Sequence, residues 1–168
     1  MANQEKNKYQ DEILIKQIEE FVAHLSVEKN YALNTVSAYK RDLLKFLSFL
    51  GNKNISGWVE VDGDTVNLFV MGLRHGDISN KSIRRYLSSI RVFYNYLIDN
   101  EVASSNPALS IQTPKIDRDL PKTIDFDDLS RMMIIKVGHF KELRAVLMIE
   151  LLYSCGLRVS ELVGIDMI

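Results

Sequence analysis

Hydrophobic residues recur every three or four positions along most of the chain, a spacing typical of α-helices. In the first 100 residues the spacing predicts four amphipathic helices, at about 11–28, 34–50, 63–73 and 79–99. Tyr39, Tyr86 and Tyr94 fall on the apolar stripes of the second and fourth helices, so we expect them in the core. No stretch shows the alternation typical of a β-strand. The pattern predicts an all-α fold that begins with a four-helix bundle.

Two local signals mark helix ends in this region. Asn34 precedes the apolar stripe of the second predicted helix, and asparagine is a favoured N-cap residue. Gly51 follows that stripe, so we expect the helix to stop there.

The helical spacing disappears between about residues 101 and 123, where all three prolines of the chain occur. Proline keeps the backbone extended and removes donors, so this segment is predicted to be a linker. Helix resumes after Asp125, a predicted N-cap, and continues to about 137–138. A strongly apolar helix follows at about 142–154, and we expect it to be buried on most sides. The predicted organisation is a helical first domain at 1–104, a linker at 105–123 and the incomplete start of a second domain at 124–168.

Composition narrows the class of protein. The 168 residues are 46% hydrophobic and 26% charged, which is ordinary for a soluble globular protein. No apolar run approaches the roughly 20 residues needed to span a bilayer, and the polar start lacks the features of a signal peptide. The single cysteine, Cys155, cannot form an internal disulfide. These features predict a cytoplasmic protein with no membrane partner, and we expect the lone thiol to be packed.

The net charge of −1 alone argues against a nucleic-acid-binding protein, but it averages over an uneven distribution. Two predicted helices carry cations and small polar residues on the face opposite the apolar stripe. The candidate DNA-binding residues on these faces are Lys40, Arg41, Lys45, Lys81, Arg84, Arg85, Ser88 and Arg91. Binding to phosphates depends on local charge density, so these faces suit DNA. The solvated face of an ordinary soluble helix is the alternative.

A second candidate site follows the apolar helix. Gly156 suits a helix C-terminus, and Arg158 comes directly before a new helical turn. A guanidinium held on such a corner is suited to binding a phosphate through two hydrogen bonds. The alternative is that Arg158 pairs with Glu161 at the start of the next helix.

The segment YSCGLRVSELVGI, residues 153–165, resembles the first arginine box of the tyrosine recombinases, the phage-integrase family, and most of all its XerC/XerD group. Thr35–Leu43 and Ser82–Leu97 resemble the second and fourth helices of that group. Asn106-Pro107-Ala108 and Leu120-Pro121-Lys122 resemble its linker landmarks. The stretch 114–133 leans towards the XerC side.

The resemblance implies a SAM-like helical domain that lays its second and fourth helices across the major groove of duplex DNA. It implies that Arg158 is the first of two catalytic arginines and holds the scissile phosphate. A tyrosine nucleophile then forms a phosphotyrosyl intermediate, with no metal and no cofactor. The implied partners are a double-stranded recombination site and a second, XerD-like recombinase in a tetrameric synapse. The implied role is resolution of chromosome dimers, which serves chromosome partition and cell division.

The other catalytic groups of the family follow the first arginine box, and the sequence ends before them. None of the three histidines lies in a His-x-x-Arg motif. The expectation is therefore a chain that contains the DNA-binding domain and the opening of a truncated catalytic domain, and that is inactive alone. Two alternatives stay open: a DNA-binding or regulatory protein without catalysis, and a helical protein–protein adaptor.

Overall fold

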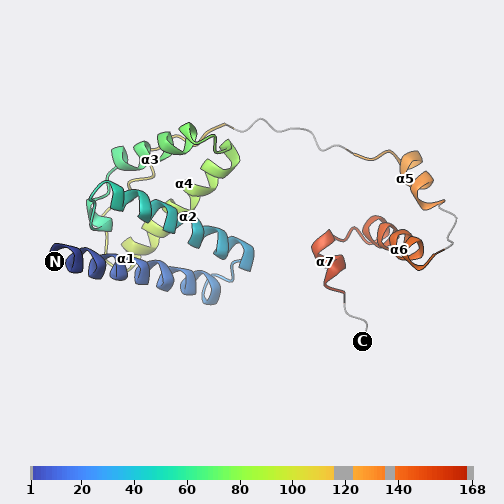
Figure 1. The fold of residues 1–168 in the computed structure, drawn as a ribbon, viewed down its shortest axis with the longest axis horizontal. Helices are drawn as coiled ribbons and strands as arrows, with labels where there is room; N and C mark the ends of the chain where they lie inside the picture. Colours follow the sequence, from blue (N-terminus) through green and yellow to red (C-terminus); the bar gives the residue numbers. More distant parts are fainter. Residues whose placement is uncertain (1, 116–122, 135–138, 166–168) are drawn as a thin grey trace. The chain divides into compact units, whose positions relative to one another are not determined.

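The computed structural model describes residues 2–115, 123–134 and 139–165, with only the backbone of 2–11 and 133. The chain forms two compact units, Met1–Asp117 and Arg118–Ile168, each of which is described by itself (Figure 1). All regular elements in the described residues are helical, which confirms the predicted all-α class. The helices are α1 (Ala2–Val27), α2 (Leu33–Asn52), the 3₁₀ turn η1 (Trp58–Glu60), α3 (Gly63–His75), α4 (Asn80–Asp99), α5 (Phe126–Met133), α6 (Phe140–Ser154) and α7 (Val159–Val163).

The core of the first unit forms where the apolar stripes of α1, α2, α3 and α4 meet. Tyr39, Tyr86 and Tyr94 are buried, as their positions on these stripes predicted. Trp58 of η1 packs edge-on against Phe93 of α4, with ring centroids 4.9 Å apart. The largest fully buried aliphatic side chains are Ile18, Leu25, Leu43, Leu50, Ile83, Leu87 and Ile90. Removing this apolar surface from water is the main force that holds the bundle together.

Side chains cap two of the predicted helices. Asp62 accepts a hydrogen bond from the amide of Thr65 at 2.8 Å and begins α3. Ser79 accepts one from the amide of Ser82 at 3.3 Å and begins α4. The N-cap predicted for α2 at Asn34 is wrong, because the helix already begins at Leu33.

The predicted stop at Gly51 is also wrong, since α2 continues through Asn52. A glycine at the end of a helix is tolerated as one more helical residue. The chain takes up the left-handed conformation only at Asn54, with φ 58°. Asparagine is one of the few residues other than glycine that adopts it readily.

The segment after α4 packs against the first unit. Ala108 is fully buried in the core, and Asn106 is also buried. The segment predicted to be a linker, 105–123, contacts α4 over residues 106–115, and nothing in the sequence pattern predicted these contacts. The methyl group of Ala108 gains burial, and the amide of Asn106 finds backbone and side-chain partners on α4. Residues 116–122 lie outside the described residues.

In the second unit, Asp125 caps α5 as predicted, accepting a hydrogen bond from the amide of Phe126 at 2.7 Å. The expectation that α6 is buried on most sides is wrong, because none of its residues is buried. Leu147, for example, is 53% exposed. Within the described part of this unit α6 contacts the short helices α5 and α7, which cover only part of its apolar surface.

Cys155 is exposed, so the expectation of a packed thiol is wrong. No helix among the described residues is both long enough and apolar enough to cross a membrane. The helix expected to continue to about 137–138 ends at Met133, so that expectation is wrong.

Candidate nucleic-acid interface

The two predicted cationic stripes lie on neighbouring helices, because α2 packs directly against α4 (Figure 1). Two polar contacts fix one helix against the other. The hydroxyl groups of Tyr39 on α2 and Ser88 on α4 are 3.1 Å apart and hydrogen-bonded. One turn along, Arg85 donates two hydrogen bonds to the carboxylate of Asp42, from Nε at 2.8 Å and from Nη2 at 2.9 Å. The exposed sides of α2 and α4 therefore form one continuous face.

The pair of Asp42 and Arg85 combines a buried carboxylate with a half-exposed cation. Asp42 is 1% exposed, whereas the Arg85 side chain is 43% exposed. Burial raises the pKa of Asp42, and the hydrogen bonds from Arg85 partly oppose that rise. The carboxylate in turn raises the pKa of Arg85. Because the cation is the exposed partner, the pair adds positive charge to the outer surface rather than cancelling it there.

Tyr86 presents an aromatic ring to cations from both helices. Lys45 Nζ of α2 lies 5.5 Å from the centre of the ring, and the guanidinium carbon of Arg85 lies 5.6 Å from it. Cation–π contacts of this length attract a positive group to the ring face. They attract Lys45 and Arg85 to the same ring without neutralising either charge.

Three further cations on these helices are unpaired within the part of the chain that the structure describes. The side chains of Arg41, Lys81 and Arg84 are exposed and form no hydrogen bond or ion pair with a described residue. We use the term cationic face for the set Arg41, Lys45, Lys81, Arg84 and Arg85. Five cations from two helices, with their one carboxylate partner buried, form a surface suited to a phosphate backbone.

The other three predicted DNA-binding residues have partners within the protein. Lys40 makes an ion pair with Glu19 of α1 at 3.5 Å. Ser88 bonds to Tyr39. Arg91 donates hydrogen bonds to three groups of the segment that follows α4. Sequence periodicity gave no signal for these partners, because all of them lie outside the two helical stripes except Tyr39.

Arg158 is the N-cap residue of α7 and follows α6 after a short turn at residues 155–157. Gly156 has a φ of 62°, which confirms its predicted place after a helix C-terminus. The Arg158 amide donates to Glu161 Oε2 at 2.8 Å, and its Nη1 donates to Oε1 at 2.9 Å. The pairing with Glu161, one of the two alternatives from the sequence, is thus present. The side chain is still 82% exposed, so most of its donors face solvent.

Comparison with known families now bears on this surface. A family model for the phage integrase N-terminal SAM-like domain matches residues 18–101, which is half of the chain and includes all of α2, α3 and α4. The chain belongs to the phage integrase family of tyrosine recombinases.

Curated relatives of this family match beyond the bundle. The chain is 35% identical to tyrosine recombinase XerC of Psychromonas ingrahamii over 150 residues, and 37% identical to tyrosine recombinase XerD of Oceanobacillus iheyensis over 150 residues. These alignments cover 89% of this chain and 50% of each relative. Tyrosine recombinase XerC of Herpetosiphon aurantiacus is 35% identical over 154 residues. The chain spans about half the length of the curated relatives it matches.

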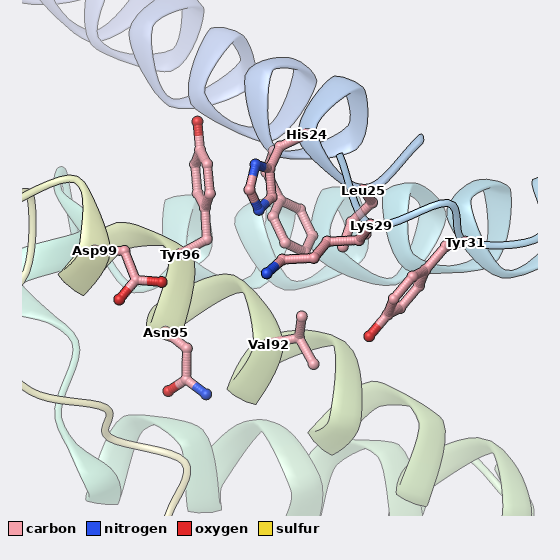
Figure 2. A pocket seen from close by; sticks show the side chains of 9 residues that line it. His24, Leu25, Lys29, Tyr31, Val92, Asn95, Tyr96 and Asp99 are labelled. Atoms are coloured by element: carbon pink, nitrogen blue, oxygen red, sulfur yellow. The ribbon is translucent and has the colours of Figure 1, made fainter. Parts of the chain in front are cut away.

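The bundle of this phage integrase family member also has a hollow away from Asp42 and Arg85, between α1 and α4. Figure 2 shows the polar groups of His24, Lys29, Tyr31, Asn95 and Asp99 around it. Its volume is 170 Å³, below the roughly 300–1,000 Å³ of ordinary ligand pockets. His24 is held by Glu28, with Nδ1 and Oε2 2.9 Å apart. At this volume the hollow does not suggest a small-molecule site, and we assign no ligand to it.

Metal binding has no candidate in this part of the protein. The described residues contain no group of three or more His, Cys, Asp or Glu side chains placed to hold a metal ion.

Proposed function

We propose that this chain supplies the DNA-binding bundle of a Xer-type site-specific recombinase, together with the first of the catalytic arginines. The observation that supports the bundle's role is the cationic face, which α2 and α4 form together in a domain of the phage integrase family. The ties from Tyr39 to Ser88 and from Asp42 to Arg85 fix α2 against α4, the two helices that carry its cations. A preformed surface of this kind binds without the cost of ordering its parts.

The proposed ligand is duplex DNA. A B-DNA major groove is about 12 Å wide and admits an α-helix, so two packed helices can reach its edges and the flanking phosphates. Arg41, Lys81 and Arg84 are exposed and unpaired among the described residues, so they are proposed as the principal phosphate contacts. Lys45 and Arg85, held against Tyr86, are proposed to sit between them.

Arg158 is proposed to bind the non-bridging oxygens of the scissile phosphate. Its guanidinium has five N–H donors, and the described structure uses only Nη1, on Glu161. The remaining N–H groups can donate hydrogen bonds to the phosphate oxygens, while Glu161 limits the freedom of the side chain. The chemistry proposed for the whole protein is strand cleavage by a tyrosine through a phosphotyrosyl intermediate. It needs neither metal nor nucleotide cofactor.

The proposed setting also follows the Xer relatives. A double-stranded recombination site is the proposed substrate, and a second, XerD-like subunit in a tetramer is the proposed partner. The proposed role is resolution of chromosome dimers in the cytoplasm, in support of chromosome partition and cell division.

Binding to duplex DNA as a function of salt tests the proposal. We expect the affinity of the 168-residue chain to fall steeply with salt, with a slope of about 0.9 in log K against log salt for each phosphate contact. A helical adaptor with merely solvated faces predicts no binding at low salt. That result would overturn the proposed function.

A second experiment separates catalysis from binding alone. The first unit has its own compact core, and this supports a DNA-binding or regulatory role as the second candidate function. A nicked duplex traps a phosphotyrosyl adduct as a band that survives denaturing electrophoresis. We expect this chain to bind the duplex without forming that band. An adduct formed by the chain alone would contradict the proposal that this chain contributes DNA binding and Arg158 but no nucleophile.

A further inference from the structure

Arg91 is the one predicted DNA-binding arginine whose guanidinium is occupied on all three nitrogens. Its Nε donates to the carbonyl of Ala108 at 2.9 Å, Nη2 donates to the carbonyl of Ile111 at 2.6 Å, and Nη1 donates to the Thr113 hydroxyl at 3.0 Å. A guanidinium used in this way has only two of its five N–H donors left for a phosphate, and every one of its nitrogens is already tied to the segment. The sequence pattern placed Arg91 on the DNA-facing stripe, but its contacts are to the chain that follows α4.

Asn106 completes the same arrangement from the other side. Its Nδ2 donates to the backbone carbonyl of Arg91 at 2.9 Å and to Asn95 Oδ1 at 2.7 Å, and its Oδ1 accepts from the amide of Ala108 at 3.1 Å. Asn106 is buried, and every polar group of its amide has a partner. Asn106 thus holds the start of the segment to α4, and Arg91 of α4 holds the residues that follow it.

The contacts also give the direction of the segment. Asn106 lies at Asn95, near the C-terminal end of α4, and the carbonyl of Lys115 accepts a hydrogen bond from Asn80 Nδ2 at 3.2 Å. Residues 106–115 therefore run antiparallel to α4 over about four turns. The segment ends at the N-terminal end of α4, where Lys81 of the cationic face lies.

We propose that Arg91 is a positioning residue that fixes residues 106–115 along α4, and that Lys115 is thereby presented as an additional DNA contact of the cationic face. The role of Lys115 as a DNA contact rests on the proposed function. Lys115 is exposed and its backbone is held next to Lys81 by Asn80. A cation in that place extends the row formed by Lys81 and Arg84 on α4.

The positioning role is tested without DNA, by the rate at which trypsin cuts after Lys115. Arg91→Lys keeps the charge but has no planar fork, so it loses most of the three hydrogen bonds. We expect both Arg91→Lys and Arg91→Gln to speed this cleavage at least about tenfold. Each hydrogen bond to a charged group stabilises the bound segment by about a factor of ten or more in its equilibrium constant. Arg84→Gln is the matched control, and its cleavage rate should equal that of the unmodified chain.

A milder variant covers the case in which a change at Arg91 unfolds the bundle. Thr113→Val removes one acceptor at an exposed position and leaves Arg91 and the core intact. It should give an intermediate cleavage rate with an unchanged thermal midpoint. Protection of Lys115 that is as strong in Arg91→Lys and Thr113→Val as in the unmodified chain would overturn the positioning role.

The contact of Lys115 with DNA is tested by combining two substitutions. We expect Lys115→Gln to reduce the salt slope by about 0.9, which at 0.1 M salt is about an eightfold loss of affinity. In the Arg91→Gln background the same change should have little further effect, because Lys115 is no longer held in place. We expect Arg91→Lys to bind DNA as weakly as Arg91→Gln.

The outcomes separate this inference from the proposed function. Equal losses from Lys115→Gln in both backgrounds, or near-normal binding by Arg91→Lys, would show that Arg91 is a direct phosphate contact and overturn the inference. If the unmodified chain fails to bind DNA, the proposed function and the role of Lys115 both fail. The cleavage rates then still decide whether Arg91 positions the segment.

Discussion

The pair of Asp42 and Arg85 makes a quantitative prediction about stability and pH. Arg85→Met removes the cation, keeps most of the side-chain volume and leaves a carboxylate that is 1% exposed without its main partner. A buried charge that loses its partner is strongly destabilising, commonly by about 3–5 kcal/mol. The reverse change, Asp42→Asn, leaves a cation that is 43% exposed and can turn to water. We therefore expect Arg85→Met to cost more than Asp42→Asn.

The cost of Arg85→Met has a ceiling set by protonation. An unpaired Asp42 can take up a proton, and each pH unit above its ordinary pKa of 3.8 makes this about 1.36 kcal/mol more costly. At pH 7 the ceiling is about 4.4 kcal/mol, and at pH 5 it is about 1.6 kcal/mol. Nearby Arg41 and Lys45 lower the pKa of Asp42 and reduce the cost further. We expect a loss of about 2–4 kcal/mol at pH 7 that shrinks as the pH falls.

The sign follows from the direction of the pKa change. Removing Arg85 raises the pKa of Asp42 in the folded state still further above its unfolded value. The neutral form of Asp42 then favours folding at low pH, and this contribution is lost as the pH rises through the raised pKa. Arg85→Met should therefore recover stability, relative to the unmodified chain, between about pH 7 and pH 5.

Urea unfolding followed by circular dichroism at several pH values measures this difference. Arg84→Met is the matched control, because Arg84 is the adjacent exposed arginine with no side-chain partner among the described residues. It should change the free energy of unfolding by less than about 0.5 kcal/mol at any pH. The double variant with Asp42→Asn and Arg85→Met carries no buried charge and should regain most of the loss. A loss that does not depend on pH would refute the reasoning.

Three further predictions concern the core and the helix ends. Ile90→Ala should lower the free energy of unfolding by about 2–5 kcal/mol in urea, because Ile90 is fully buried. Burial raises the pKa of Tyr94, whose hydroxyl donates to the carbonyl of Trp58 at 2.9 Å. Tyr94 should thus stay neutral above pH 10, and absorbance at 295 nm should show its ionisation only when the bundle unfolds. The neutral hydroxyl stabilises the folded bundle, and this contribution is lost as the pH rises through the raised pKa of Tyr94. Gly156→Ala should reduce the helical circular dichroism of the second unit by straining a φ of 62°, at a cost of about 1 kcal/mol. Gly164→Ala, at a φ of −89°, should not.

The sequence predicted the bundle well because its helices satisfy local rules that agree with one another. The spacing of apolar residues on α4 identified Tyr86 and Tyr94 as core residues, and both are buried. Capping was less predictable. Ser79 and Asn34 are both good N-cap residues, but only Ser79 caps, because the position of a helix start depends on how the preceding loop approaches the bundle.

The sequence predicted that α2 and α4 carry a cationic surface, but it did not predict which of its residues are free to bind a ligand. Helical periodicity put Arg84 and Arg91 on one stripe with Arg85 beside it, and it cannot tell which of them has a partner distant in sequence. Asp42 lies 43 positions before Arg85, and Ile111 lies 20 positions after Arg91. Asp42 falls within the apolar run of α2, and a carboxylate at a core position is a sequence signal for a buried ion pair. The DNA contacts themselves stay predictions.

The extent of the second unit's core was the least predictable feature. The composition of α6 indicated a buried helix, whereas its side chains are at best half-buried in the described residues. A hydrophobic pattern reports what a helix needs to bury, and the described part of this unit offers only α5 and α7 to cover it.

The salt dependence of DNA binding by the double variant with Arg41→Gln and Arg84→Gln tests the central claim most directly. The measurement is fluorescence anisotropy of a labelled duplex at several salt concentrations, with Lys16→Gln, on the exposed side of α1, as the control. If the cationic face binds the phosphates, the slope falls by about 1.8 in the double variant and stays unchanged in the control. An unchanged slope in the double variant would contradict the account.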